Sequence, residues 1–141
     1  MRKLISKPII IVILIVIIFI MLIGYNIMKN KQVINNIKNI TKITVTTEPG
    51  GDKKLKTIKN KDEIEDIVNY INDLDMKKTS EDVTKYSGMS YIITVYYKDK
   101  TSKEYVHYGN IFFKEMGKEW YTIPYKQAEK FESIYNNVGN K

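Results

Sequence analysis

The chain has 141 residues, no cysteine and a net charge of +7. The absence of cysteine excludes disulfides and thiolate metal sites. The charge does not indicate a nucleic-acid-binding protein, because residues 43–141 contain 16 basic and 16 acidic side chains and the whole excess lies in residues 1–42. No basic helix or zinc-finger spacing is present either, so we expect no nucleic-acid partner.

An uninterrupted apolar run dominates the start of the chain. Residues 9–23 read IIIVILIVIIFIMLI. With the residues up to Met28, the run is about 20 residues long, which at about 1.5 Å per residue crosses a hydrocarbon core of about 30 Å. We therefore predict a transmembrane helix over residues 8–28, preceded by a tail formed by residues 1–7.

The apolar run is longer than the hydrophobic part of a cleaved signal peptide, and no A-x-A-like site follows it. We therefore predict an uncleaved signal anchor, with cleavage as the alternative. Arg2, Lys3 and Lys7 make the tail basic, and a long C-terminal part translocates largely regardless of its charge. We expect a single-pass protein of the cell membrane, with the N-terminus cytoplasmic, the C-terminal domain extracytoplasmic and the lipid bilayer as a partner.

Residues 29–42 are predicted to form a basic stem that contains no acidic side chain. Its lysines anchor the end of the membrane helix or contact anionic lipid head groups. Its apolar residues are spaced as on a helix, which favours a helical continuation of the membrane segment. These residues are Val33, Ile34, Ile37 and Ile40.

Residues 43–141 are predicted to form one small α+β domain in the order β-β-α-β-β-β-α. Alternation of apolar and polar residues and β-branched side chains predict the strands, at residues 43–47, 55–58, 91–98, 103–113 and 119–123. Residues 48–52 are predicted as a turn and residues 75–89 as a loop. A mainly antiparallel sheet with both helices on one face is the simplest packing for these elements.

Both helices of this domain have clear start signals. Asn60 and Glu63 fit a capping box, and Pro124 suits the first position of the last helix. Each helix has an apolar face. The faces consist of Ile64, Ile67, Val68, Ile71 and Leu74 in the first helix and of Ala128, Phe131, Ile134, Tyr135 and Val138 in the last.

At the level of pattern, the chain resembles small membrane-anchored extracytoplasmic domains of low-GC Gram-positive bacteria. The segments that carry the resemblance are KITVTTEPG, DEIEDIVNYIND, SYIITVYYKDK and KEWYTIPYKQAEKFESIY. The resemblance covers most of residues 43–138 and contains no catalytic motif. It therefore implies an envelope location and transfers no functional residues.

The residues that usually carry chemistry are sparse. His107 is the only histidine and lies in a predicted strand, where a hydrogen-bonded structural role is expected. The serines match neither G-x-S-x-G nor S-x-x-K. The acids Asp62, Glu63, Glu65 and Asp66 suit either calcium or the dipole of a helix start, and we favour the dipole. We therefore predict no catalytic, cofactor-binding or metal-binding residues, no cofactor and no enzymatic activity.

Tyrosine is abundant, and Trp120 is the only tryptophan. Strand alternation favours Tyr96, Tyr108 and Trp120 on one face of the sheet, where they are the candidate partner-binding residues. Tyr97, Tyr105 and Tyr121 are expected on the other face or at its margin. The alternative interpretation is that these rings are half-buried on a pleated surface without binding anything.

Together these features favour a non-catalytic interaction module that binds an envelope protein, a peptide or a glycan. Two alternatives stay open. The chain could be a small accessory or immunity-type membrane subunit that acts through its transmembrane helix, although that helix lacks a small-xxx-small motif. It could also be a cell-envelope hydrolase, which the missing catalytic motifs disfavour.

Overall fold

The computed structural model describes residues 7–29, 33–48 and 54–139, and the side chains of residues 11–24, 33–48 and 55–139. The predicted tail before Lys7 and most of the predicted turn at 48–52 lie outside the described residues. The chain divides into two compact units, Met1–Val33 and Ile34–Lys141. Each unit is described by itself.

The first unit contains the helix α1 (Lys7–Lys29), which is 23 residues long and begins and ends within one residue of the prediction. Its large apolar side chains from Ile11 to Ile23 are each 43–68% exposed. In the part of the chain that the structure describes, no helix combines the length and hydropathy of a membrane span. The predicted transmembrane role of this helix is therefore not supported there.

The second unit has an α+β fold, as predicted, but the order of its elements differs from the predicted β-β-α-β-β-β-α. A two-residue strand, Lys77–Lys78, lies within the region predicted as a loop, and two strands replace the one predicted at 103–113. The described residues of this unit form a seven-stranded sheet in the order β2-β1-β4-β5-β6-β7-β3, and all of its strand pairs are antiparallel. The strands are β1 (Ile40–Glu48), β2 (Lys54–Ile58), β3 (Lys77–Lys78), β4 (Ser90–Tyr97), β5 (Ser102–Tyr108), β6 (Phe112–Glu115) and β7 (Tyr121–Thr122).

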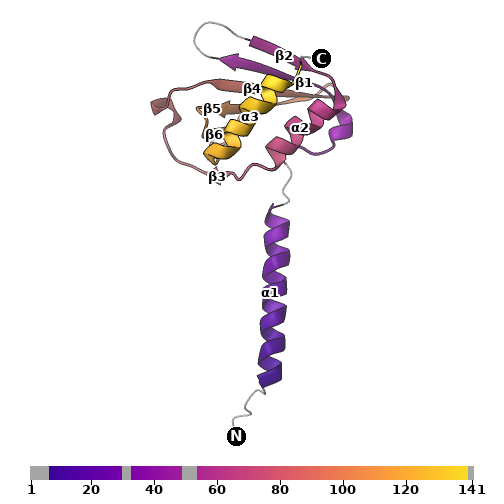
Figure 1. The fold of residues 1–141 in the computed structure, drawn as a ribbon, viewed down its shortest axis with the longest axis vertical. Helices are drawn as coiled ribbons and strands as arrows, with labels where there is room; N and C mark the ends of the chain where they lie inside the picture. Colours follow the sequence, from indigo (N-terminus) through magenta and orange to yellow (C-terminus); the bar gives the residue numbers. More distant parts are fainter. Residues whose placement is uncertain (1–6, 30–32, 49–53, 140–141) are drawn as a thin grey trace. The chain divides into compact units, whose positions relative to one another are not determined.

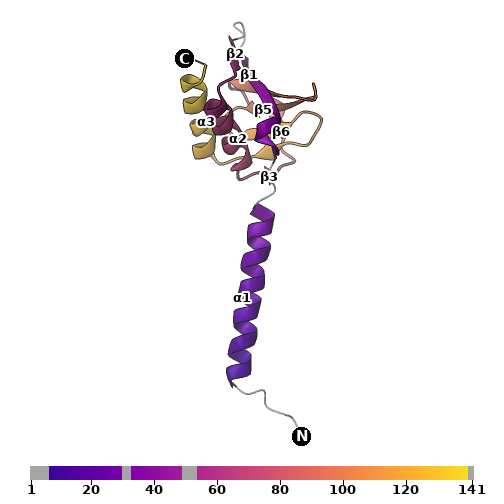
Figure 2. The ribbon, with the colours of Figure 1, turned by 90° about the vertical axis from the view of Figure 1, so that its right-hand side faces the viewer.

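Two helices, α2 (Lys61–Asn72) and α3 (Tyr125–Asn137), cover the same face of this sheet (Figures 1 and 2). Short 3-10 turns, η1 (Ile37–Asn39) and η2 (Val83–Lys85), precede β1 and β4. The core lies between the helices and the sheet. Its fully buried residues include Ile43, Val45, Ile58, Ile67, Ile71, Ile93, Tyr105, His107, Phe113 and Phe131.

The start of α2 follows the predicted capping arrangement in part. The Asn60 side chain accepts hydrogen bonds from the backbone N–H groups of Asp62 and Glu63, at 2.9 and 3.4 Å. The Glu63 carboxylate, instead of closing the capping box, lies 3.4 Å from the backbone nitrogen of Gly139. The first turn of α2 is thereby connected to the residues that follow α3.

Lys56 ties the edge strand β2 to the end of α3. Its ammonium group donates hydrogen bonds to the carbonyl oxygens of Tyr135, at 2.6 Å, and Val138, at 3.0 Å. It also lies 4.5 Å from the centroid of the Tyr135 ring. A cation at this place satisfies carbonyls that the helix itself leaves without donors and complements the negative end of the helix dipole.

The predicted strand at 103–113 is wrong, because the chain reverses within it. Gly109 and Asn110 have φ values of 58° and 62°, and they separate β5 from β6. Glycine and asparagine tolerate this left-handed conformation better than other residues, so the pair forms a tight hairpin turn. The hairpin places Phe112 opposite Tyr108, instead of four residues further along one strand.

The stem does not continue α1 as a helix. Residues 33–36 form no helix, and Ile34 and Ile40 are buried in the second unit. The backbone N–H of Ile34 donates to the side-chain oxygen of Asn72, at 2.8 Å, and the Asn72 amide donates to the carbonyl of Ile34, at 3.0 Å. The apolar residues that suggested a helix are thus core residues of the folded unit.

Candidate interaction surface

The face of the sheet that points away from α2 and α3 has half-exposed side chains. On β4, Tyr91, Ile93 and Val95 are buried under the helices, so Ile92 and Thr94 point to the opposite side. The same alternation holds on β1 and β5. We call this surface the open face; its half-exposed residues include Thr44, Thr46, Ile92, Thr94, Tyr96, Val106 and Tyr108.

The strand register separates the three predicted binding residues into two groups. Tyr96 pairs with Ser102, whereas Tyr108 pairs with Ser90 at the other end of β4. Ser102 and Tyr108 are six residues apart on β5, which corresponds to about 20 Å along the strand. Tyr108 and Trp120, in contrast, are neighbours, with ring centroids 6.3 Å apart. The open face therefore has Tyr96 at one end and the Tyr108–Trp120 pair at the other.

Phe112 and Lys114, which the sequence did not suggest, complete the second group. The ring of Phe112 lies edge-on to Trp120, with centroids 6.2 Å apart, and the ammonium group of Lys114 lies 4.4 Å from the centroid of Trp120. Phe112 is fully buried although it belongs to the open face. The Gly109-Asn110 pair was the sequence signal that could have placed Phe112 beside Tyr108.

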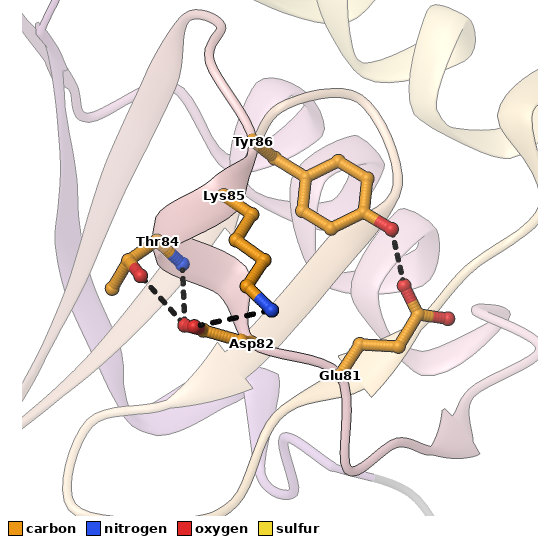
Figure 3. Close-up of polar contacts among 5 residues, drawn as sticks. All are labelled: Glu81, Asp82, Thr84, Lys85 and Tyr86. Atoms are coloured by element: carbon orange, nitrogen blue, oxygen red, sulfur yellow. Dashed lines mark hydrogen bonds and ion pairs between the residues drawn. The ribbon is translucent and has the colours of Figure 1, made fainter.

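The segment between β3 and β4 covers this end of the open face. Tyr86 packs edge-on against Phe112 at 4.8 Å, and its carbonyl accepts a hydrogen bond from the Tyr108 hydroxyl. The Tyr86 hydroxyl donates to Glu81 (Figure 3). The hydrogen bond to Glu81 raises the pKa of Tyr86 above its usual range. Part of the predicted binding group is thus occupied by the protein's own chain.

The same segment stabilises itself through Asp82, as Figure 3 shows. The Asp82 carboxylate accepts hydrogen bonds from the backbone N–H and the hydroxyl of Thr84, at 3.2 and 2.6 Å. Lys85 lies 4.0 Å from the same carboxylate. These contacts form the start of η2, which lies within the region predicted as a loop.

At the other end of the open face, the ammonium group of Lys42 lies 4.4 Å from the centroid of the Tyr96 ring. Tyr96 and Trp120 therefore both have a lysine over the ring. Of the tyrosines expected elsewhere, Tyr105 is fully buried under the helices, and Tyr97 and Tyr121 are half-exposed. Burial raises the pKa of the Tyr105 hydroxyl well above its usual range.

His107 lies in the core and not at a surface. It is fully buried, its ring stacks on Phe131 at 5.6 Å, and Tyr91 lies edge-on at 5.8 Å. Contrary to the expected hydrogen-bonded role, neither ring nitrogen has a hydrogen-bond partner among the described residues. Burial lowers the pKa of His107 to about 4, so the imidazole is neutral at pH 7.

The acidic residues of α2 do not assemble into a metal site in the part of the chain that is described. No group of three or more potential ligands comes together there. Glu63 and Asp66 instead line a shallow depression between the start of α2 and the end of α3, together with Ser133 and Asn137. Asp62 and Glu63 lie in the first turn of α2, where they complement the helix dipole.

Comparisons of the chain with protein-family models, with curated proteins and with solved structures find no match. The resemblance noted from the sequence is therefore neither supported nor contradicted by known relatives.

Proposed function

We propose that this chain is a membrane-anchored, non-catalytic interaction module that binds an envelope partner through its open face. The observation that carries the proposal is the placement of both helices on one side of the sheet (Figure 2). This placement leaves threonines, aliphatic side chains and aromatic rings half-exposed on the other side. A face with this mixture suits a protein contact, since aromatic and aliphatic groups contribute buried area and hydroxyls contribute hydrogen bonds.

The length of α1 supports the anchor. Its 23 residues correspond to about 34 Å, slightly more than a hydrocarbon core of about 30 Å. The structure describes the side chains of α1 only for residues 11–24, the middle of the helix. In the sequence, the apolar stretch is longer: Ile9 and Ile10 precede these residues, and Ile27 and Met28 follow them. Exposed side chains of this kind need an apolar environment, so we propose that α1 lies in the cell membrane, with the domain extracytoplasmic.

The lysines over the aromatic rings favour a protein or peptide partner over a glycan. A sugar that stacks on the ring of Tyr96 or Trp120 competes with Lys42 or Lys114 for the ring face. A protein surface that packs on ring edges, Ile92 and Val106 leaves both lysines in place. We therefore propose a protein or peptide partner.

The burial of His107 supports a non-catalytic role. An imidazole without solvent access in the structure cannot contact a substrate without opening the core. The acids at the start of α2 take part in no group of three or more possible metal ligands among the described residues. Enzymatic activity lost in H107F with the fold intact would contradict this part of the proposal.

The proposal is tested by site-specific photo-cross-linking in native membranes. A photoreactive residue at position 94, in the centre of the open face, should give adducts of defined mass. One at position 130, on the exposed side of α3, should not. Replacement of residues 8–28 by an unrelated transmembrane helix should leave the adducts unchanged. If the helix replacement abolishes them, the membrane helix recognises the partner and the accessory-subunit alternative is favoured.

Two variants assign the contact to the open face. T46K places a charged side chain on the open face without removing a core group, and Y108A/W120A removes the aromatic pair. Both should abolish the adducts formed from position 94. Y125A, which removes an exposed ring from α3, is the matched control and should have no effect. Adducts that persist in T46K, with a circular dichroism spectrum like that of the parent protein, would rule out binding through the open face.

A further inference from the structure

The fold brings two lysine-rich segments together at one corner of the sheet. Ile40 and Lys42 of β1 pair with Tyr97 and Tyr96 of β4, and the backbone N–H of Lys98 donates to the carbonyl of Asn39 at 2.8 Å. The turn after β4 thereby lies beside the residues that precede β1. We call Lys38, Lys42, Lys98 and Lys100 the basic corner; Lys42 is half-buried and the other three are exposed.

Two of the acids near the basic corner are engaged in other contacts, and a third, Glu104, lies on the open face opposite Thr94. Asp99 is the one acid within the turn; its carboxylate accepts hydrogen bonds from the hydroxyl and the backbone N–H of Thr101, at 2.6 and 3.0 Å, which lower its pKa. On the neighbouring strands, Glu115 has two lysine partners, Lys118 at 2.8 Å and Lys103 at 3.9 Å. These surroundings leave the corner with a net positive charge. The acids of the first turns of α2 belong to the helix layer, on the other face of the sheet from Lys42. The helix α2 itself contacts η1, which carries Lys38.

Aromatic rings accompany the lysines of this corner. Tyr96 lies on the open face beneath Lys42, and Tyr97 follows it in the chain; both are half-exposed. Tyrosine and lysine together are typical of surfaces that contact a membrane interface, because the ring tolerates the head-group region and the ammonium group pairs with lipid phosphate.

We infer that the basic corner docks the folded unit on an anionic lipid surface. The inference rests on the proposed membrane anchor. In the chain, only residues 30–33 separate α1 from the folded unit, and Lys38 follows four residues after Ile34. Five residue steps of extended chain span at most about 18 Å. The chain thus keeps Ile34 within about 18 Å of the end of α1. Lys98 and Lys100 extend the lysine series of residues 29–42, because the fold places the turn after β4 beside Asn39.

The inference is tested by measuring lysine acylation rates of the full chain in nanodiscs. One set of discs contains phosphatidylcholine alone, and the other contains phosphatidylcholine mixed with phosphatidylglycerol. Lys38, Lys98 and Lys100 should react several-fold more slowly in the anionic discs, since an anionic surface contributes about fivefold in affinity per nearby lysine. Lys126 and Lys130 on α3 should react equally in both, and high salt should remove the difference. Equal rates at the basic corner would overturn the inference.

A second measurement separates the corner from the anchor. With α1 inserted in both kinds of nanodisc, the slower acylation of Lys38 in anionic discs relative to neutral discs reports the docking of the corner and not the anchor. K98Q/K100Q should reduce this protection of Lys38 several-fold, whereas K126Q/K130Q, with the same change in charge, should not. A chain that does not incorporate into neutral discs contradicts the anchor alone. Protection of Lys38 that is unchanged in K98Q/K100Q contradicts the basic corner alone.

Discussion

At the scale of single residues, the most consequential side chain is a buried, uncharged histidine. His107 is surrounded by the rings of Tyr70, Tyr91, Phe113 and Phe131, none of which carries a charge at neutral pH. Such an environment disfavours the imidazolium form, because a charge removed from water requires a compensating partner. His107, for which the sequence predicts a hydrogen-bonded structural role, therefore affects stability without a hydrogen-bond partner among the described residues.

The stability of the folded unit should fall as the pH falls from about 6.5 to about 4. Burial lowers the pKa of His107 from its ordinary value of 6.5 to about 4 in the fold. The unfolded chain binds more protons in this window, so the free energy of unfolding rises with pH there. The stabilisation is fully present above pH 6.5 and lost below pH 4, and it amounts to about 3 kcal/mol. Urea denaturation at pH 7 and pH 4 measures it.

The histidine contribution is isolated with H107F, which removes both unpaired nitrogens. The carboxylates titrate in both proteins, so their effect cancels in the comparison. Between pH 7 and pH 4, the free energy of unfolding of the parent should fall by about 3 kcal/mol more than that of the variant. H107L serves the same purpose if the larger ring does not fit. Equal losses in the parent and in the variants would show that His107 does not titrate in this window.

Asn72 should be a strong stabilising residue in spite of its polar side chain. Ile34 is 1% exposed, so its backbone groups lack water and depend on the Asn72 amide. N72A leaves both groups unpaired and should cost about 2–3 kcal/mol in the free energy of unfolding. Hydrogen exchange at the Ile34 amide should accelerate in parallel. N69A, a substitution at an exposed position of α2, is the control; if it accelerates the same amide equally, the effect is not specific to Asn72.

At the scale of elements, hydrogen bonds to the backbone decide where helices and strands end. The apolar periodicity of α2 predicted its buried face correctly, since Ile64, Ile67, Val68 and Ile71 are all buried; Leu74 is also buried but follows the end of the helix. The hairpin at Gly109-Asn110 was missed because the residues on both sides of it are mostly aromatic or β-branched, as in one continuous strand. A short turn signal within a strong strand pattern is easily overridden in a sequence analysis, although its positive φ values determine the topology.

The end of α3 should depend on Lys56, which comes from β2. K56M keeps most of the aliphatic side chain and removes the charge, so the carbonyls of Tyr135 and Val138 lose their ammonium donor. We expect a loss of about 1–2 kcal/mol in the free energy of unfolding. Hydrogen exchange in the last turn of α3 should increase. K126M, on the exposed side of the first turn, should change neither quantity; an unaltered last turn in K56M would contradict the capping role.

At the scale of the whole molecule, the chain combines a uniformly apolar helix with a unit that has its own core. The described core residues of the second unit lie between Ile34 and Val138, so its packing does not require α1. The two parts can therefore be altered independently. This independence allows the proposed anchor and the proposed binding surface to be tested by separate substitutions.

The proposed anchor should be sensitive to charge at the middle of α1. I15R/I18R places two guanidinium groups where each costs about 2.5–3.5 kcal/mol in a membrane helix. The parent chain should remain in the membrane pellet after alkaline extraction, and the variant should move largely to the supernatant. E129R, on the exposed side of α3, is the control. Equal fractionation of the parent and I15R/I18R would contradict a membrane-spanning α1.

The sequence by itself determined the elements whose signals are local, because periodicity and caps depend on near neighbours in the chain. These elements are α1, the apolar face and start of α2, the position of α3 and most of the strands. Only the tertiary structure decided which of the candidate binding residues meet. The register of β4 and β5 separates Tyr96 from Tyr108, and the β5–β6 hairpin brings Phe112 and Trp120 beside Tyr108. Strand register and turns bring together residues that are distant in sequence, and no local pattern specifies such pairs.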